Sequence, residues 1–172
     1  AESAAGQYPV EAVRTMDSVA REVQNDQNYA GIMKASRNAE RHTIADGIVA
    51  AAREIAETTD IKAICCFTES GTTASLVSRE RPRVPIIALS PSIDTVRRLS
   101  LTWGTTCVNT ESLERFKQAV INAAEAATEN GFATTDDQIV VTAGVPFNQP
   151  GTTNILRVAP CDVRLINRAD PE

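Results

Sequence analysis

The clearest chemical potential in the chain lies in residues 68–73, which read Thr-Glu-Ser-Gly-Thr-Thr. An apolar run that ends at Phe67 precedes this segment, and a helical pattern that begins near Ala74 follows it. Gly71 lets the backbone turn tightly and approach a ligand. The hydroxyl groups can donate hydrogen bonds, and the N-terminus of the next helix offers free N–H groups and a partial positive charge. The pattern predicts a phosphate-binding turn made of Thr68, Ser70, Gly71, Thr72 and Thr73.

An ordinary strand-to-helix turn with an N-cap residue explains the same residue types. Glu69 is the side chain that limits the phosphate interpretation. A carboxylate about 4 Å from a phosphate costs roughly 1–4 kcal/mol in polar surroundings. Phosphate binding therefore requires that Glu69 points away, that it pairs with an arginine, or that the ligand carries little charge. Both interpretations of the turn stay open from the residues alone.

No set of residues with catalytic or metal-binding spacing accompanies this turn. The only histidine, His42, precedes a helix and is interpreted as a capping or surface residue. Ser70-Gly71 is not a G-x-S-x-G nucleophile elbow, and Gly71 is not followed by the Gly-Lys-Ser/Thr of a Walker motif. The four cysteines, at positions 65, 66, 107 and 161, lack C-x-x-C spacing and are interpreted as free thiols in a reducing cytosol. We expect no catalytic residue and no metal site.

Composition indicates one globular domain of 172 residues, with 42% hydrophobic and 23% charged residues. The net charge of −5 argues against broad nucleic-acid binding, which usually needs a basic excess. No apolar run approaches the roughly 18–20 residues that cross a membrane, so no membrane partner is expected. The chain opens on Ala1 without an initiator Met or a signal peptide, which suggests a processed product or an excised fragment in the cytoplasm.

Hydrophobic periodicity predicts a helix from Tyr8-Pro9 to about Gln24. Residues 25–41 are polar and weakly patterned, and we interpret them as a linker or an irregular crossing, the best candidate for a domain boundary. A second helix is expected over 43–58, because Thr43 and Asp46 resemble a capping box. Strands are predicted over 62–67, 85–89, 105–109, 138–142 and 153–158, with helices over 72–81, 92–102 and 111–130. Glu111 is placed in the first turn of the last of these helices, which ends at Asn130-Gly131. The charged tail from Asp162 onward is expected to be frayed or draped on the surface.

Short apolar strands that alternate with helices predict a mostly parallel sheet covered on both faces. The connection before the last strand is too short for a helical crossover, so this strand is expected to be antiparallel. Open α/β sheets bind ligands at the carboxyl ends of their strands. We therefore expect the 68–73 turn, the Ser90-Pro91-Ser92 turn and the 144–152 loop to converge on one pocket.

Three passages of the chain resemble the carboxyl-terminal part of pyruvate kinase. They are residues 2–13 (ESAAGQYPVEAV), residues 67–82 (FTESGTTASLVSRERP) with 85–88 (PIIA), and residues 151–158 (GTTNILRV). The first resembles the segment that enters the last helix of the enzyme's (β/α)8 barrel, the second its effector phosphate loop, and the third its last loop and strand. The resemblance implies a barrel remnant over 1–24, a linker over 25–41, the C-terminal domain over 42–160, and a tail over 161–172. The implied fold is a three-layer α/β/α domain with a five-stranded sheet whose last strand is antiparallel.

The resemblance also implies a function. The family transfers a phosphoryl group from phosphoenolpyruvate to ADP in glycolysis, giving pyruvate and ATP, with Mg2+ and usually K+. Its catalytic residues lie in the barrel, so the chain alone is expected to be inactive. The C-terminal domain implies an allosteric role and a subunit contact in a cytoplasmic homotetramer. Carried over by motif, the 68–73 turn holds an effector phosphate, and a loop that includes Gly144, Pro150, Gly151 and Thr152 closes over the rest.

The chain departs from the family members that bind fructose bisphosphate. Glu69 stands where those members tend to have a basic or small residue. Ser112 and Ala119 occupy the places of the Trp and Arg that hold the second phosphate. A sugar monophosphate or AMP is therefore the expected effector. Two alternatives stay open: a structural, tetramer-forming module whose loop binds nothing, which Glu69 favours, and a stand-alone phosphometabolite-binding protein, against which the barrel-like segment argues.

Overall fold

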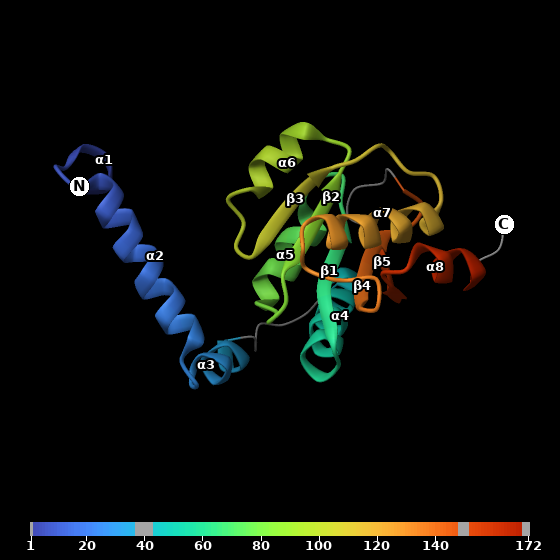
Figure 1. Cartoon of the computed structure of the whole chain (residues 1–172), viewed down its shortest axis with the longest axis horizontal. Coiled ribbons are helices and arrows are strands. Elements are labelled where there is room, and N and C mark those ends of the chain that lie inside the picture. The colour runs from blue at the N-terminus through green and yellow to red at the C-terminus, as the bar shows by residue number, and fades with distance from the viewer. Residues whose placement is uncertain (1, 37–42, 148–151, 170–172) are drawn as a thin grey trace. The chain divides into compact units, whose positions relative to one another are not determined.

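The computed structural model describes residues 2–36, 43–147 and 152–169, and the chain divides into two compact units, residues 1–40 and 41–172. The first unit contains the short helix α1 (Glu2–Ala5), the long helix α2 (Pro9–Asn25) and α3 (Tyr29–Ser36) (Figure 1). Pro9 occupies the first turn of α2, where its fixed φ suits a helix and its missing N–H costs nothing. The predicted first helix is thus confirmed.

Helix α3 corrects the expectation that residues 25–41 are irregular. The Asp26 carboxylate accepts the backbone N–H of Asn28 at 2.7 Å, and the Asp26 carbonyl accepts that of Tyr29 at 3.0 Å. This turn starts a new helix that carries Ile32 and Met33 one turn after Tyr29. The apolar spacing is present in the sequence, but its polar flanks hide it. Residues 37–42, which include His42, lie outside the described residues.

The second unit alternates helices and strands in the expected order (Figure 1). Its elements are α4 (Ile44–Thr58), β1 (Ile61–Phe67), α5 (Thr72–Glu80), β2 (Ile86–Ser90), α6 (Ile93–Leu99), β3 (Thr105–Asn109), α7 (Phe116–Glu129), β4 (Gln138–Gly144), β5 (Thr153–Pro160) and α8 (Val163–Ala169). The five strands form one sheet in the order β3-β2-β1-β4-β5. The pairs β3–β2, β2–β1 and β1–β4 are parallel, and β5 runs antiparallel to β4, as predicted.

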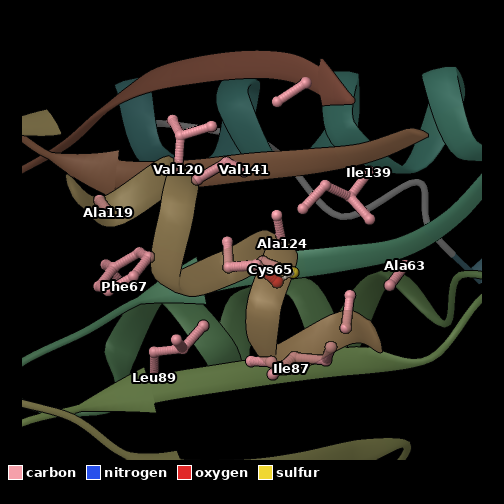
Figure 2. Packing of buried hydrophobic residues seen from close by; sticks show 14 of the residues in the cluster. Ala63, Cys65, Phe67, Ile87, Leu89, Ala119, Val120, Ala124, Ile139 and Val141 are labelled. Atoms are coloured by element: carbon pink, nitrogen blue, oxygen red, sulfur yellow. Dashed lines mark hydrogen bonds between the residues drawn. The ribbon is translucent and has the colours of Figure 1, made fainter. Parts of the chain in front are cut away.

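Two apolar clusters lie on opposite faces of the sheet and make the three-layer α/β/α fold. Alternate residues of β1 supply the two faces, with Cys65 in one cluster and Ile64 in the other. On the Cys65 face the strands pack against α7, whose Ala119 and Ala124 let the helix approach the sheet closely (Figure 2). The other cluster gathers apolar side chains of α4, α5 and α6, including Val49, Val77 and Leu99. Burial on both faces explains the almost continuous apolar run of β1.

The capping box predicted for the second helix is confirmed. The Thr43 hydroxyl accepts the backbone N–H of Asp46 at 3.1 Å, and the Asp46 carboxylate accepts that of Thr43 at 3.2 Å. At the other end of the domain, Gly131 has φ of +71°, so the predicted stop at Asn130-Gly131 also holds. Both signals depend on local hydrogen bonding and backbone freedom, which a sequence shows directly.

The expected start of α7 is wrong, and the expectation of a frayed or surface-draped tail is corrected in part. Helix α7 begins at Phe116 rather than at residue 111, because residues 110–115 form a loop that turns Leu113 into the core. The tail is not frayed throughout, since α8 covers residues 163–169 and its Ile166 is fully buried. Burial of this side chain contributes about 1.5–3 kcal/mol toward holding the short helix against the domain. Helix α6 is also shorter than expected and ends at Leu99.

Candidate functional site

The strand order creates a crevice at the carboxyl ends of β1 and β4. The chain leaves β1 toward β2 and β3 on one side, then returns to place β4 and β5 on the other. Ligands of open α/β sheets bind where the strand order reverses in this way. A hollow lies at this point, and we call it the switch-point pocket. Its described lining comes from the end of β1 and from four connections. The residues are Phe67, Thr68, Glu69, Ser70, Thr72 and Thr73 at and after the end of β1, Pro91 after β2, Glu111 and Leu113 after β3, and Gly144, Phe147, Thr152 and Thr153 around the connection from β4 to β5.

The turn after β1 is shaped by Thr68 and Gly71. Thr68 is buried, and its hydroxyl oxygen accepts the backbone N–H of Gly71 at 2.9 Å. Gly71 has φ of +86°, a conformation that disfavours any residue with a side chain. A Cβ atom at this position would also lie 3.2 Å from Leu99 Cδ2. The Gly71 carbonyl then accepts both the N–H and the hydroxyl of Ser75 at 3.0 Å, which starts α5 directly at the pocket.

Two side chains of helix α6 donate hydrogen bonds to the same turn, which the sequence did not indicate. The Thr95 hydroxyl donates to the Glu69 carbonyl at 2.9 Å. The Arg98 guanidinium donates to the Ser70 carbonyl. Two neighbouring carbonyls of the turn are thus bonded to side chains of α6. The signal in the sequence is only an Arg-Arg pair, which is typical of a solvated helix end.

Two hydroxyl pairs complete the cradle. The oxygens of Ser70 and Thr72 lie 3.0 Å apart. The oxygens of Thr73 and Thr153 lie 2.6 Å apart and are both buried, so this pair ties the start of α5 to the start of β5. The structure therefore places all five residues predicted for phosphate binding in a single turn at a helix N-terminus. Such a turn offers neutral donors and a partial positive charge, which suit an anion.

Described residues on either side of positions 148–151, between β4 and β5, form another wall of the pocket. Gly144 lies so close to Thr152 that a Cβ atom on it would be 2.5 Å from the Thr152 hydroxyl oxygen. The Asn154 amide makes two hydrogen bonds to Val145, accepting its N–H at 2.9 Å and donating to its carbonyl at 2.7 Å. Gly144 and Thr152, both predicted to belong to an effector loop, line the pocket, and the Asn154 hydrogen bonds hold this region in place. Pro150 and Gly151 lie outside the described residues.

The electrostatic character of the pocket comes from acidic side chains. Glu69 and Glu111 are exposed at its lining, and among the described lining residues there is no Lys or Arg. Sequence reasoning missed Glu111 because it assigned this residue to the first turn of α7. The positive end of α5 is therefore the main attraction for an anion, and two carboxylates act against it.

A second charged group lies beside the pocket, at the start of α4. Hydrogen bonds from the Thr43 hydroxyl and from Arg79, whose guanidinium lies 2.5 Å from the carboxylate, lower the pKa of Asp46 to about 2. Asp46 and Arg79 line a neighbouring hollow that shares Thr72 and the start of β5 with the switch-point pocket. Arg79 is thus committed to Asp46 and to joining α5 to α4.

The cysteines belong to the core. Cys65, Cys66 and Cys161 are buried free thiols, as predicted, and Cys107 is a partly buried one. Burial raises the pKa of Cys66 to about 12, so this thiol is uncharged at neutral pH. Within residues 2–36, 43–147 and 152–169, no group of three His, Cys, Asp or Glu side chains could hold a metal ion. In the same ranges no helix is both long enough and apolar enough to cross a membrane.

Comparison with known proteins decides the family. A family profile described as "Pyruvate kinase, alpha/beta domain" matches residues 46–159. This chain belongs to the pyruvate kinase family. Pyruvate kinases of Methylorubrum extorquens and Agrobacterium vitis are each 40% identical to it, over 159 and 158 residues, and that of Clostridium acetobutylicum is 36% identical over 157 residues.

These matches cover 91–92% of this chain but 33% of each relative, so the chain spans about a third of the length of these pyruvate kinases. The resemblance of the sequence to the C-terminal part of pyruvate kinase is thereby confirmed. The family profile ends at residue 159, whereas the pyruvate kinase domain described here continues through α8.

Proposed function

We propose that this chain is the C-terminal regulatory and oligomerisation domain of a pyruvate kinase, and that it binds a phosphorylated effector in the switch-point pocket. The observation that most directly supports this proposal is the turn over residues 68–73. It places hydroxyl groups and the N-terminus of α5 on one wall of a hollow, at the point where the strand order reverses. Phosphate is the ligand for which this combination of donors is best suited.

The effector in this proposal carries one phosphate, as a sugar monophosphate or AMP does, rather than the two of fructose bisphosphate. The start of α5 supplies one cradle. Ser112 lies in the exposed loop before α7, and Ala119 is fully buried on α7. Neither side chain is a cation that could hold a second phosphate, and the described lining of the pocket contains none.

The remaining parts of the proposal follow the family. The whole protein catalyses phosphoryl transfer from phosphoenolpyruvate to ADP in the cytoplasm, as a step of glycolysis and as a homotetramer. Residues 1–24 are the last helix of its catalytic barrel, residues 25–41 are a linker, and residues 42–160 are the regulatory domain. Mg2+ and K+ bind in the barrel, so the 172-residue chain alone is inactive.

The proposal is tested by titrating the 15N-labelled chain with inorganic phosphate and with a hexose monophosphate. We expect the largest amide shifts at Gly71 to Ala74. Because a hydrogen bond to a charged group contributes about 1.5–3 kcal/mol, the combined change of Ser70→Ala and Thr72→Val weakens binding by roughly tenfold or more. Thr135→Val, at an exposed position away from the pocket, is the matched control. Shifts that are absent from the α5 N-terminus, or equal in the two variants, would contradict the assignment.

The second candidate is a structural module that assembles subunits and binds no effector. The observation in its favour is the pair of carboxylates, Glu69 and Glu111, on the pocket lining. Under this candidate the same titration gives no saturable shift with either ligand. The two candidates therefore differ in one measurement on the same sample.

A further inference from the structure

We propose that Glu111 determines which phosphorylated ligand the switch-point pocket accepts. In this assignment it selects a monophosphate whose other end carries hydroxyl or amine donors, and it rejects a second phosphate. The inference rests on the proposed function, because it concerns the selectivity of the same pocket.

Glu111 is held in place by anchors on both sides. Just before it, the backbone N–H of Thr110 donates to the Ser90 carbonyl at 3.1 Å, and the Thr110 hydroxyl accepts from the Asn122 amide at 3.1 Å. Just after it, Leu113 is buried in the cluster beneath α7. The loop after β3 is thus tied to the end of β2, to α7 and to the core. The position of Glu111 at the pocket is a property of the fold rather than of a free loop.

Glu69 presents a second carboxylate from an equally fixed segment. The residue before it is buried, and its own carbonyl accepts the Thr95 hydroxyl. Glu69 and Glu111 are both exposed residues of the pocket lining, and in the described part of the chain no ion pair or side-chain hydrogen bond is found for either carboxylate. Two negative charges therefore lie at the hollow, and a ligand that donates hydrogen bonds can compensate them.

The composition of the lining decides how a ligand can use these charges. The described lining contains no Lys or Arg. One phosphate can use the N-terminus of α5, but a second meets two carboxylates and no cation among the described lining residues. Hydroxyl and ammonium groups, by contrast, donate hydrogen bonds to carboxylates and gain from their charge.

The experiment measures binding of four probes to the 172-residue chain by calorimetry: inorganic phosphate, glucose 6-phosphate, glucosamine 6-phosphate and fructose 1,6-bisphosphate. The variants are Glu111→Gln and the matched control Glu114→Gln, which changes an exposed carboxylate of the same loop outside the pocket lining. The wild-type chain is expected to bind the amino sugar most tightly and the bisphosphate most weakly of the three sugar phosphates.

Removing one like charge near a phosphate in polar surroundings changes affinity by about fivefold or more. Glu111→Gln therefore lowers the preference for glucosamine 6-phosphate over glucose 6-phosphate, and raises bisphosphate affinity, each by that factor. Its affinity for inorganic phosphate changes least, because this probe fills only the cradle. Glu114→Gln keeps the wild-type ratios, and equal urea midpoints for the three chains show that folding is intact.

The possible failures are distinct. Unchanged ratios in Glu111→Gln, or the same change in Glu114→Gln, overturn the role of Glu111 and leave phosphate binding in place. A wild-type chain that binds none of the four probes overturns the proposed function, and the selectivity assignment with it. Tight binding of the bisphosphate by the wild-type chain also contradicts the assignment.

Discussion

At the scale of single residues, Gly71 carries the geometry of the pocket, and its replacement is the sharpest test of that geometry. Gly71→Ala forces a side chain into φ of +86° and brings its Cβ to 3.2 Å from Leu99 Cδ2. We expect a loss of about 1–2 kcal/mol of unfolding free energy, together with weaker phosphate binding. Gly47→Ala is the matched control, because Gly47 lies inside α4 with nothing within 4 Å of its Cβ position. That change should stabilise the chain by about 0.5–1 kcal/mol in urea unfolding. Equal effects at the two glycines would contradict the strained conformation.

Asp46 leads to a prediction for the pH dependence of the unfolding free energy. Its pKa falls from the usual 3.8 to about 2 because it accepts hydrogen bonds from Thr43 and Arg79. A carboxyl with a lowered pKa in the folded state contributes stability that is complete above pH 4 and is lost as the pH falls toward 2. Asp46→Asn should remove this part of the acid destabilisation, and Thr43→Val should reduce it. The check is the unfolding free energy of each chain between pH 5 and pH 2. An Asp46→Asn chain that loses as much stability as the wild type would rule out this role.

At the scale of elements, Ile166 tests whether α8 is part of the folded domain. Its side chain is fully buried in the cluster shared with α7, whereas its neighbour Leu165 is 47% exposed. Ile166→Ala should cost about 2–5 kcal/mol, because it removes apolar contacts and leaves a cavity. Leu165→Ala should cost less than about 1 kcal/mol. Urea unfolding of both variants measures the difference. Two small and similar values would show that α8 frays in solution.

The same scale shows what the sequence could and could not predict. All five strands were predictable, and the clearest were β1, β2 and β4, because burial on both faces leaves almost continuous apolar runs. Helix α8 was not, because its few apolar residues lie among charged ones, and only the fold shows that Ile166 is buried while Leu165 is exposed. The start of α7 was misplaced because Glu111 to Leu113 fit a helix locally, while Leu113 gains more by entering the core. The strand order predicted that the loops converge on the pocket. The place of Glu111 on the lining was missed, because this residue was assigned to the first turn of α7.

At the scale of the whole molecule, the two units differ in how far their apolar side chains are buried. Helix α2 carries apolar side chains that stay more than half exposed, among them Val13, Met16 and Val23. An apolar stripe of this kind is typical of a surface that packs against another element. In the second unit, by contrast, both faces of the sheet are covered by its own helices. The chain therefore combines a self-sufficient domain with a helix that lacks a covered apolar face.

This difference predicts that residues 41–172 fold without the first unit. Removal of residues 1–40 should change the unfolding free energy of the domain by no more than about 0.5 kcal/mol, because none of the apolar side chains that form the core clusters is removed. Trp103, the only tryptophan, lies in the second unit, so its fluorescence during urea unfolding reports on that unit in both chains. Ile166→Ala in the shortened chain should cost the same as in the full chain, since additivity holds for distant sites. A loss well above 1 kcal/mol on shortening would mean that α2 or α3 stabilises the domain. An unchanged midpoint with lower binding of a hydrophobic dye would place the exposed apolar surface on the first unit alone.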